Sequence, residues 1–131
     1  MPLPYHPRRG EVLICDFDTG FQPPEMVKKR PVVVLSCKES HNRRLCTVVP
    51  FSTTAPTPAL AWHHPLPHVV VPGLLATAPM WAKCDMIATV SFERLNKPYR
   101  KTRHGRQYIE LVLSDVDLQA IAACVRLYLT L

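Results

Sequence analysis

Three cations stand directly before an apolar run in the stretch PPEMVKKRPVVVLS, residues 23–36. They are Lys28, Lys29 and Arg30, and an acid, Glu25, lies five residues before the arginine. Arginine can stabilise negative charge that develops on a phosphate, because its donors are paired in a plane and its charge is permanent. The plainer interpretation is solvated charge where a loop enters a sheet. The cluster alone leaves both interpretations open.

Hydroxyl groups and a second charged pair occur further along the chain. Ser52, Thr53 and Thr54 follow an apolar segment, where hydroxyls most often cap a turn. Lys83 and Asp85, two residues apart in another apolar segment, would share one face of a strand and could form an ion pair there. Cations, hydroxyls and carboxylates are the groups needed to cleave RNA through attack of a 2′-hydroxyl, without a metal. Composition makes this chemistry possible and does not establish it.

Three histidines, His63, His64 and His68, suggest a metal site. However, His63 and His64 are adjacent and point apart, prolines constrain the segment, and no cysteine or carboxylate lies nearby in the sequence. We therefore expect no metal. The sequence also has no glycine-rich phosphate loop and no dinucleotide-binding pattern, so we expect no cofactor.

The formal net charge of +6 is concentrated in one place. The stretch KPYRKTRHGR, residues 97–106, holds five cations and no acid, and we expect it to be a loop or hairpin. Such a patch favours a polyanion such as nucleic acid, with a solvated turn as the alternative. Within it, Tyr99 and His104 are candidates for stacking on bases. The expected phosphate contacts are Arg100, Lys101 and Arg103.

The cysteines and the first residues indicate the compartment. Five cysteines are widely spaced, and none forms a C-x-x-C pair, which is typical of buried free thiols in a reducing environment. The N-terminal MPLPYHPRRG lacks the apolar run of a signal peptide, and no stretch approaches a membrane span. We expect a cytoplasmic protein with no membrane partner.

The length of 131 residues predicts a single domain, 1–131. Fourteen prolines favour long, stiff loops around a β-rich body. A long loop is expected over 52–67, and 80–91 is expected to form one strand or two short ones joined by a kink. The strands are expected at 11–17, 30–36, 45–51, 68–72, 80–91 and 106–114.

The C-terminal residues change from strand to helix periodicity. Ser114 is a good N-cap, and Asp115 and Asp117 place negative charge in the first turn of a helix expected over 115–130. Apolar residues occupy more than one face of this helix, so it is either enclosed in the core or shared with another chain. The sequence therefore predicts a mostly β fold, a small and strongly bent sheet or barrel, with a C-terminal α-helix.

In the order and spacing of its segments, the chain resembles the MazF/PemK family, the toxins of bacterial toxin–antitoxin pairs. The resemblance covers nearly the whole chain, although no single motif is highly specific. It implies an SH3-like barrel of five to seven strands with a C-terminal α-helix, a homodimer and a cognate antitoxin. It also implies a sequence-specific, metal-independent endoribonuclease that acts on single-stranded RNA. The segments that carry it are RRGEVLICDF, the acid ahead of RP, VVPFST, KCD and LSDVDLQAIAACV.

The resemblance also assigns roles to residues. Arg30 matches the catalytic arginine, Ser52 the catalytic threonine or serine, and Glu25 the acid of the loop between the first two strands. Lys83 and Asp85 match an arginine and an aspartate that lie in the active site of some members. The RNA contacts expected around this centre are Lys28, Lys29, Thr53, Lys83 and Asp85.

The chain departs from the family pattern at several positions. Pro23 and Pro24 replace a Gly-Ser before the acid, a lysine replaces the glycine ahead of the arginine, and Lys83 cannot donate two parallel hydrogen bonds. The loop is therefore expected to be stiffer, and the cleavage sequence does not follow from the resemblance. Two alternative functions also stay open. One is a non-catalytic SH3-like module that binds protein or RNA. The other is a gyrase poison of related fold, which would leave Arg30 and Ser52 unexplained.

Overall fold

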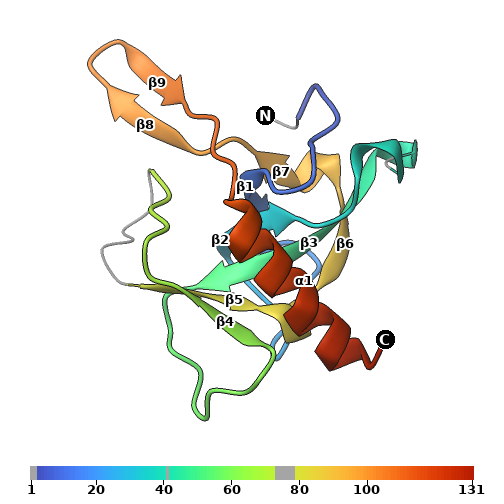
Figure 1. Ribbon diagram of the computed structural model, residues 1–131. Helices are drawn as coiled ribbons and strands as arrows, with labels where there is room; N and C mark the ends of the chain where they lie inside the picture. The colour runs from blue at the N-terminus through green and yellow to red at the C-terminus, as the bar shows by residue number, and fades with distance from the viewer. Residues whose placement is uncertain (1–2, 41, 73–78) are drawn as a thin grey trace.

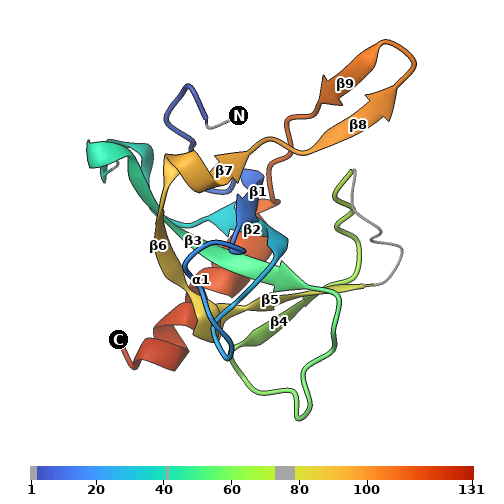
Figure 2. The ribbon, with the colours of Figure 1, turned by 180° about the vertical axis from the view of Figure 1, so that it is seen from behind.

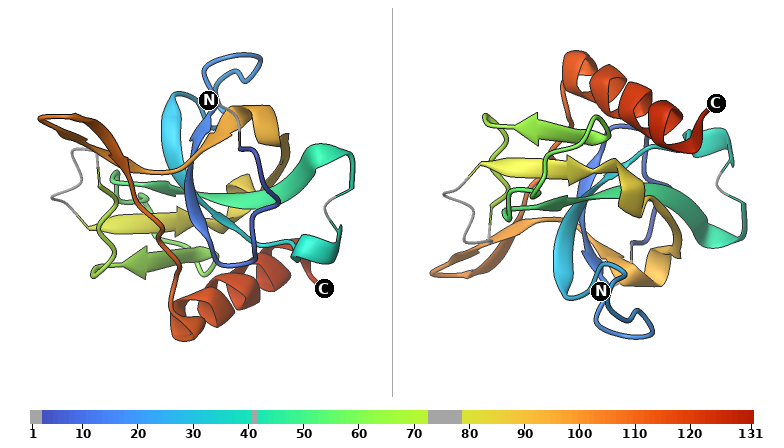
Figure 3. Two further views of the ribbon diagram at one scale, coloured as in Figure 1. Left: turned by 90° about the horizontal axis from the view of Figure 1, so that it is seen from above. Right: turned by 90° about the horizontal axis from the view of Figure 1, so that it is seen from below.

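The computed structural model describes residues 3–40, 42–72 and 79–131. One α-helix, α1 (Asp115–Leu129), lies across a strongly bent antiparallel sheet (Figures 1 and 3). Short 3-10 turns, η1 (Lys38–Ser40), η2 (Asn42–Arg44), η3 (Cys84–Met86) and η4 (Phe92–Arg94), join some of the strands. The strands are β1 (Val12–Asp16), β2 (Lys29–Val34), β3 (Leu45–Ser52), β4 (His63–Leu66), β5 (Met80–Lys83), β6 (Ala88–Ser91), β7 (Leu95–Asn96), β8 (Tyr99–Thr102) and β9 (Gly105–Tyr108).

The main sheet follows the order β4-β5-β3-β2-β1-β7, with β6 paired to β3 outside this path. The segment β6–η4–β7 pairs with β3 at one end and with β1 at the other, so it bridges the side that the bent sheet leaves open. The predicted mostly β fold with a C-terminal helix is confirmed. The hydrogen-bonded path described by the structure is open, and it does not form a closed barrel.

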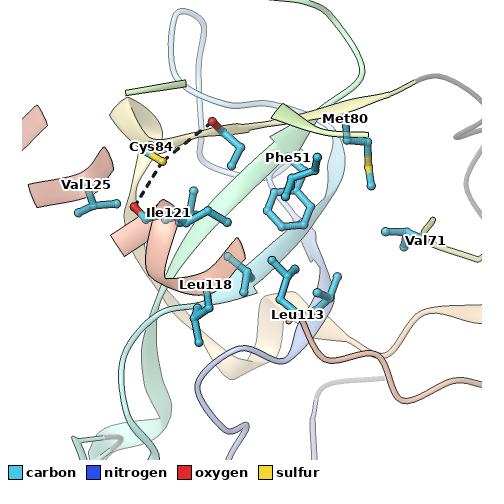
Figure 4. Close-up of a cluster of buried hydrophobic side chains, with 13 residues drawn as sticks. Phe51, Val71, Met80, Cys84, Leu113, Leu118, Ile121 and Val125 are labelled. Carbon is cyan, nitrogen blue, oxygen red and sulfur yellow. Dashed lines mark hydrogen bonds between the residues drawn. The ribbon is translucent and has the colours of Figure 1, made fainter. Parts of the chain in front are cut away.

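Side chains of β3 alternate between two hydrophobic clusters because successive residues of a strand point to opposite faces. Val49 and Phe51 face α1 and pack in one cluster with Ile121 (Figure 4). Val48 points to the other face and packs with Phe17 of the loop after β1. We call this second face, turned away from α1, the far face of the sheet.

The helix begins and ends close to where its sequence predicts. The Ser114 hydroxyl accepts a hydrogen bond from the Asp117 N–H at 3.2 Å, and Thr130 closes the helix in the left-handed conformation. Leu118, Ile121 and Val125 form its buried stripe. Helix 115–130 is therefore confirmed to within one residue.

Replacing Ser114 with alanine should lower the free energy of unfolding by about 1 kcal/mol, because it removes the acceptor for an otherwise unpaired N–H of the first turn. Urea denaturation followed by circular dichroism measures this change. Ser114→Asp is the matched control, since aspartate caps as well as serine and should restore most of the loss. An alanine variant as stable as the parent chain would contradict the assigned cap.

The predicted strand at 68–72 is wrong. The strand lies at β4, inside the expected loop 52–67, and it occupies the pairing edge of β5. Val71 is buried in the cluster under α1 without entering a ladder, and Val69 packs against the same cluster, whereas Val70 is 66% exposed. Pro65 stands within β4 and lacks an N–H, which an edge strand tolerates. The prolines in this segment therefore led to the prediction of a loop where the structure has strand β4.

Two other expected strands differ in detail. The segment 80–91 consists of β5 and β6 joined by η3, as the kink predicts. The expected strand 106–114 is shorter, because β9 ends at Tyr108 and a single bridge joins Val112 to Glu11 further on.

All five cysteines are free thiols. Burial raises the pKa of Cys15, Cys46 and Cys84 to about 12, so these thiols stay protonated near neutral pH.

Candidate functional site

Arg30 and Ser52 come from neighbouring antiparallel strands, β2 and β3. The ladder between these strands ends at the pair Val32 and Pro50, and the next residues on the same side of each strand are Arg30 and Ser52. Arg30 also stands opposite Cys15 of β1, whose side chain packs in the far-face cluster. Since directly opposed residues share a face, the fold places both candidates on the far face, at the end of the sheet.

Strands β4 and β5 extend this row across the sheet. Ser52 pairs with Trp81 of β5, and Lys83 lies two residues further along the same strand, opposite His63 of β4. Ala82, between them, packs in the cluster under α1, so Trp81 and Lys83 point to the far face. We call the side chains gathered in this way the far-face site: Arg30, Ser52, His63, Trp81 and Lys83.

The Ser52 hydroxyl is buried, with 6% of the residue exposed, and it accepts a hydrogen bond from the Thr54 N–H at 3.1 Å. The hydroxyl thus caps a turn, the commoner role for this residue type, and keeps its own proton to donate. Thr53 is exposed beside it. Glu11 is the other buried polar side chain among the described residues, and the Tyr5 hydroxyl donates to it. The hydrogen bond from Tyr5 therefore explains how the Glu11 side chain can be buried.

In the loop before β2, the predicted acid and the arginine have separate hydrogen-bond partners. Arg30 is half-buried, and its Nε donates to the carbonyl oxygen of Val27 at 3.2 Å. Glu25 is exposed, and its carboxylate accepts from the Gln22 N–H at 2.9 Å. Within the described ranges, no salt bridge joins Glu25 to Arg30. The strand register therefore places Arg30 and Ser52 on one face, and Glu25 is bonded within its own loop.

Lys28 has a φ of 73°, in the left-handed region that favours glycine. A residue with a side chain adopts this conformation at a cost of about 1–2 kcal/mol. The chain therefore makes this bend with a lysine. Lys29 follows at the start of β2, exposed and opposite Asp16 of β1.

The expected ion pair between Lys83 and Asp85 is wrong. The chain leaves the strand after Lys83 and turns into η3, so the alternation that would place the two side chains together ends there. Asp85 instead lies with its Oδ1 3.5 Å from His63 Nε2. His63 Nδ1 accepts from the Leu60 N–H at 3.1 Å, so the ring carries its proton on Nε2, toward Asp85.

His64 points to the opposite side of β4, where its Nε2 lies 3.2 Å from Asp117 Oδ1 of α1. The adjacent histidines therefore diverge, as their spacing predicts. Across residues 3–40, 42–72 and 79–131, no group of three or more histidine, cysteine or acidic side chains is placed to hold a metal. Sequence reasoning missed Trp81 and His63 as members of the site. The alternation of MWAK, which puts Trp81 and Lys83 on one face, was the available signal for the first of them.

The basic stretch forms the hairpin β8–β9, a separate two-stranded sheet, which confirms the expected hairpin. The hairpin projects from the body on the side where β3 ends (Figures 1 and 2). Arg100, Lys101 and Arg103 are all exposed on it. These predicted RNA contacts therefore lie on an arm outside the far-face site.

A profile of the PemK-like, MazF-like toxins of type II toxin–antitoxin systems matches residues 8–129. The chain is 34% identical to the Escherichia coli protein YifN over 74% of this chain and 76% of that protein. It resembles the crystal structure of MazF from Deinococcus radiodurans with a TM-score of 0.68 at 18% identity, over 97% of this chain and 99% of that one.

A mycobacterial endoribonuclease solved in complex with its cognate antitoxin has a TM-score of 0.60 and 18% identity, over 95% of this chain and 96% of that one. At these identities the two structures show a shared fold. In the part of the chain that the structure describes, no helix has the length and apolar character to cross a membrane.

Proposed function

Since the chain belongs to the PemK-like, MazF-like toxins of type II toxin–antitoxin systems, we propose that it is a metal-independent, sequence-specific endoribonuclease that cleaves single-stranded RNA. One observation carries this proposal. The registers of β2, β3 and β5 gather a permanent cation, a buried hydroxyl and a second cation on one face: Arg30, Ser52 and Lys83. We propose that residues 1–131 act as one toxin domain.

In the proposed reaction, the 2′-hydroxyl of a nucleotide attacks the adjacent phosphate, and the 5′-oxygen leaves. The product end is a cyclic 2′,3′-phosphate. Arg30 would stabilise the added negative charge of the phosphorane through paired N–H donors, and the Ser52 hydroxyl would donate to a phosphate oxygen. The 2′-hydroxyl gives up a proton and the leaving 5′-oxygen takes one up, and Glu25 is the proposed carboxylate for this proton transfer. Proposed RNA contacts beside these groups are Lys28, Lys29, Thr53, Lys83 and Asp85.

A nuclease assay on a long unstructured RNA, with a chelator present, tests the proposal. We expect defined fragments with cyclic phosphate ends, and the same fragments with and without chelator. RNA that is bound and left intact would favour the non-catalytic binding module. Inhibition of gyrase supercoiling, with RNA untouched, would favour the gyrase poison.

We further propose a cognate antitoxin and a cytoplasmic location. A structural relative is solved with its antitoxin, and the net charge of +6 suits an acidic partner segment. The five free thiols suit a reducing compartment.

A homodimer is supported by an exposed apolar stripe on α1. Val116 is 79% exposed and Leu127 52%, and they lie on one side of the helix with Ala120 and Ala123 between them. Leu131, which follows the end of the helix, is 85% exposed. A stripe of this kind on a helix whose opposite side is already buried fits a second copy of the chain.

The unmodified protein should therefore show a mass near twice the 14.8 kDa chain mass in light scattering at micromolar concentration. Leu127→Glu should shift it to the monomer, because it places a charge in the apolar contact. Gln119→Glu, on the polar side of α1, is the matched control and should stay dimeric. A monomeric parent protein would contradict the proposal.

A further inference from the structure

We propose that the hairpin β8–β9 is a stacking arm for single-stranded RNA, with an aromatic and cationic face that binds bases outside the cleavage site. This inference rests on the proposed function for its substrate class. The register of the hairpin separates its residues into two faces. Tyr99 stands opposite Tyr108, and Lys101 opposite Arg106, and all four lie on one face because they occupy alternate positions.

The side chains of this face contact one another. The Tyr99 and Tyr108 ring centroids are 5.8 Å apart, and the guanidinium of Arg106 lies 4.4 Å from the centroid of Tyr99. Tyr108 is 46% exposed, although tyrosine is a residue that usually packs at least one side of its ring. The result is a pair of tyrosine rings, with a guanidinium over the ring of Tyr99, on an arm that is exposed along most of its length.

The residues at the tip of the hairpin shape its turn. The Thr102 hydroxyl donates to the Gly105 carbonyl at 2.7 Å and accepts from the His104 N–H at 3.2 Å, so it shapes the turn. Gly105 has a φ of 115°, which a residue with a side chain rarely adopts. His104 is therefore part of the tip. Of the two expected stacking candidates, Tyr99 lies on the aromatic face beside Tyr108, whereas His104 lies at the tip.

The combination of rings and cations favours RNA over an acidic polypeptide. An acidic segment would be bound by the cations alone, whereas every base has a flat face that stacks on tyrosine or on a guanidinium. The arm projects on the side of the body where β3 ends, and β3 ends at Ser52. A strand held at the far-face site can therefore continue toward the hairpin.

The test measures binding with strands that cannot be cleaved, so that its result does not depend on nuclease activity. The probes are a 2′-O-methyl single strand and a strand of the same length without bases. The parent protein should bind the strand with bases more tightly. In Tyr99→Leu/Tyr108→Leu, binding of that strand should weaken by about 5- to 150-fold, the equivalent of one stacked base, while binding of the baseless strand is unchanged.

Two further variants act as controls. Tyr99→Phe/Tyr108→Phe keeps the rings and should bind as the parent does. Arg100→Gln, on the opposite face, should weaken binding of both strands equally and lower the slope of log K against log salt by about 0.7. A leucine variant that still prefers bases, or that loses both strands equally, would overturn the inference. So would equal competition by poly-glutamate at matched charge. Absence of cleavage in the nuclease assay would instead defeat the proposed function.

Discussion

Replacing Arg30 with alanine should slow RNA cleavage by about 10²–10³-fold and leave the fold intact, because one preorganised donor to the developing phosphorane charge is lost. Arg30 is half-buried near the start of β2. Among the described residues, its side chain makes one hydrogen bond, to the carbonyl oxygen of Val27. Truncating the Arg30 side chain to alanine therefore removes a cation and takes no ion-pair partner from a buried acidic group of the described residues. The measurement is kcat/KM on a fluorescent RNA with chelator present, together with a thermal melt to confirm folding.

Two variants make this result specific to the arginine. Arg30→Lys keeps the charge and loses the paired donors, so its cleavage rate should fall between those of the parent and the alanine variant. Lys38→Ala removes a cation of the exposed turn η1, away from the far-face site, and should cleave normally. Near-normal cleavage by Arg30→Ala would show that the charge is stabilised elsewhere.

The sequence alone was sufficient to predict an element where its residues show both a regular periodicity and a clear boundary. Helix α1 has a cap at Ser114 and a buried stripe ending near Val125, and both are written in residue types. Strand β2 ends in a run of three valines that is buried on both faces, since Val33 and Val34 lie in different clusters. Such features need no knowledge of distant residues.

Features that depend on distant partners could not be read in this way. The valine run 69–71 has high strand propensity, yet β4 takes the pairing edge of β5 in its place. Asp85 lies beside His63, a residue more than twenty positions away, because η3 interrupts the strand. The β6–η4–β7 segment bridges the open side of the bent sheet, and no local pattern predicts its pairing with both β3 and β1.

The far-face site includes features that the sequence predicted and features that depend on residues distant in the sequence. Arg30 and Ser52 were assigned from a resemblance in segment order, and the structure adds the register that makes them neighbours on one face. Their relation to Trp81 follows from the pairing of β3 with β5, which the sequence does not specify. The roles of these residues stay predictions until the variants are measured.

Replacing Ile121 with alanine should lower the free energy of unfolding by about 2–5 kcal/mol. Ile121 is fully buried between α1 and the sheet, where it packs in the cluster that contains Phe51 (Figure 4). Its carbonyl oxygen lies 3.8 Å from the Sγ of Cys84, so the backbone holds the helix close to η3 and the truncated side chain leaves a cavity that cannot easily collapse. A loss of this size is a large part of the roughly 5–15 kcal/mol that stabilises a typical domain.

Urea denaturation at one fixed protein concentration measures the change, since dimerisation would make stability depend on concentration. Gln119→Ala, on the exposed side of the same helix, is the matched control and should change stability by no more than about 0.5 kcal/mol. If Ile121→Ala is as stable as the control, α1 does not carry the core of the sheet. If it is destabilised as expected, RNA cleavage should fall at temperatures where the variant begins to unfold. Below them it should stay normal, because Phe51 faces α1 while its neighbour Ser52 faces the site.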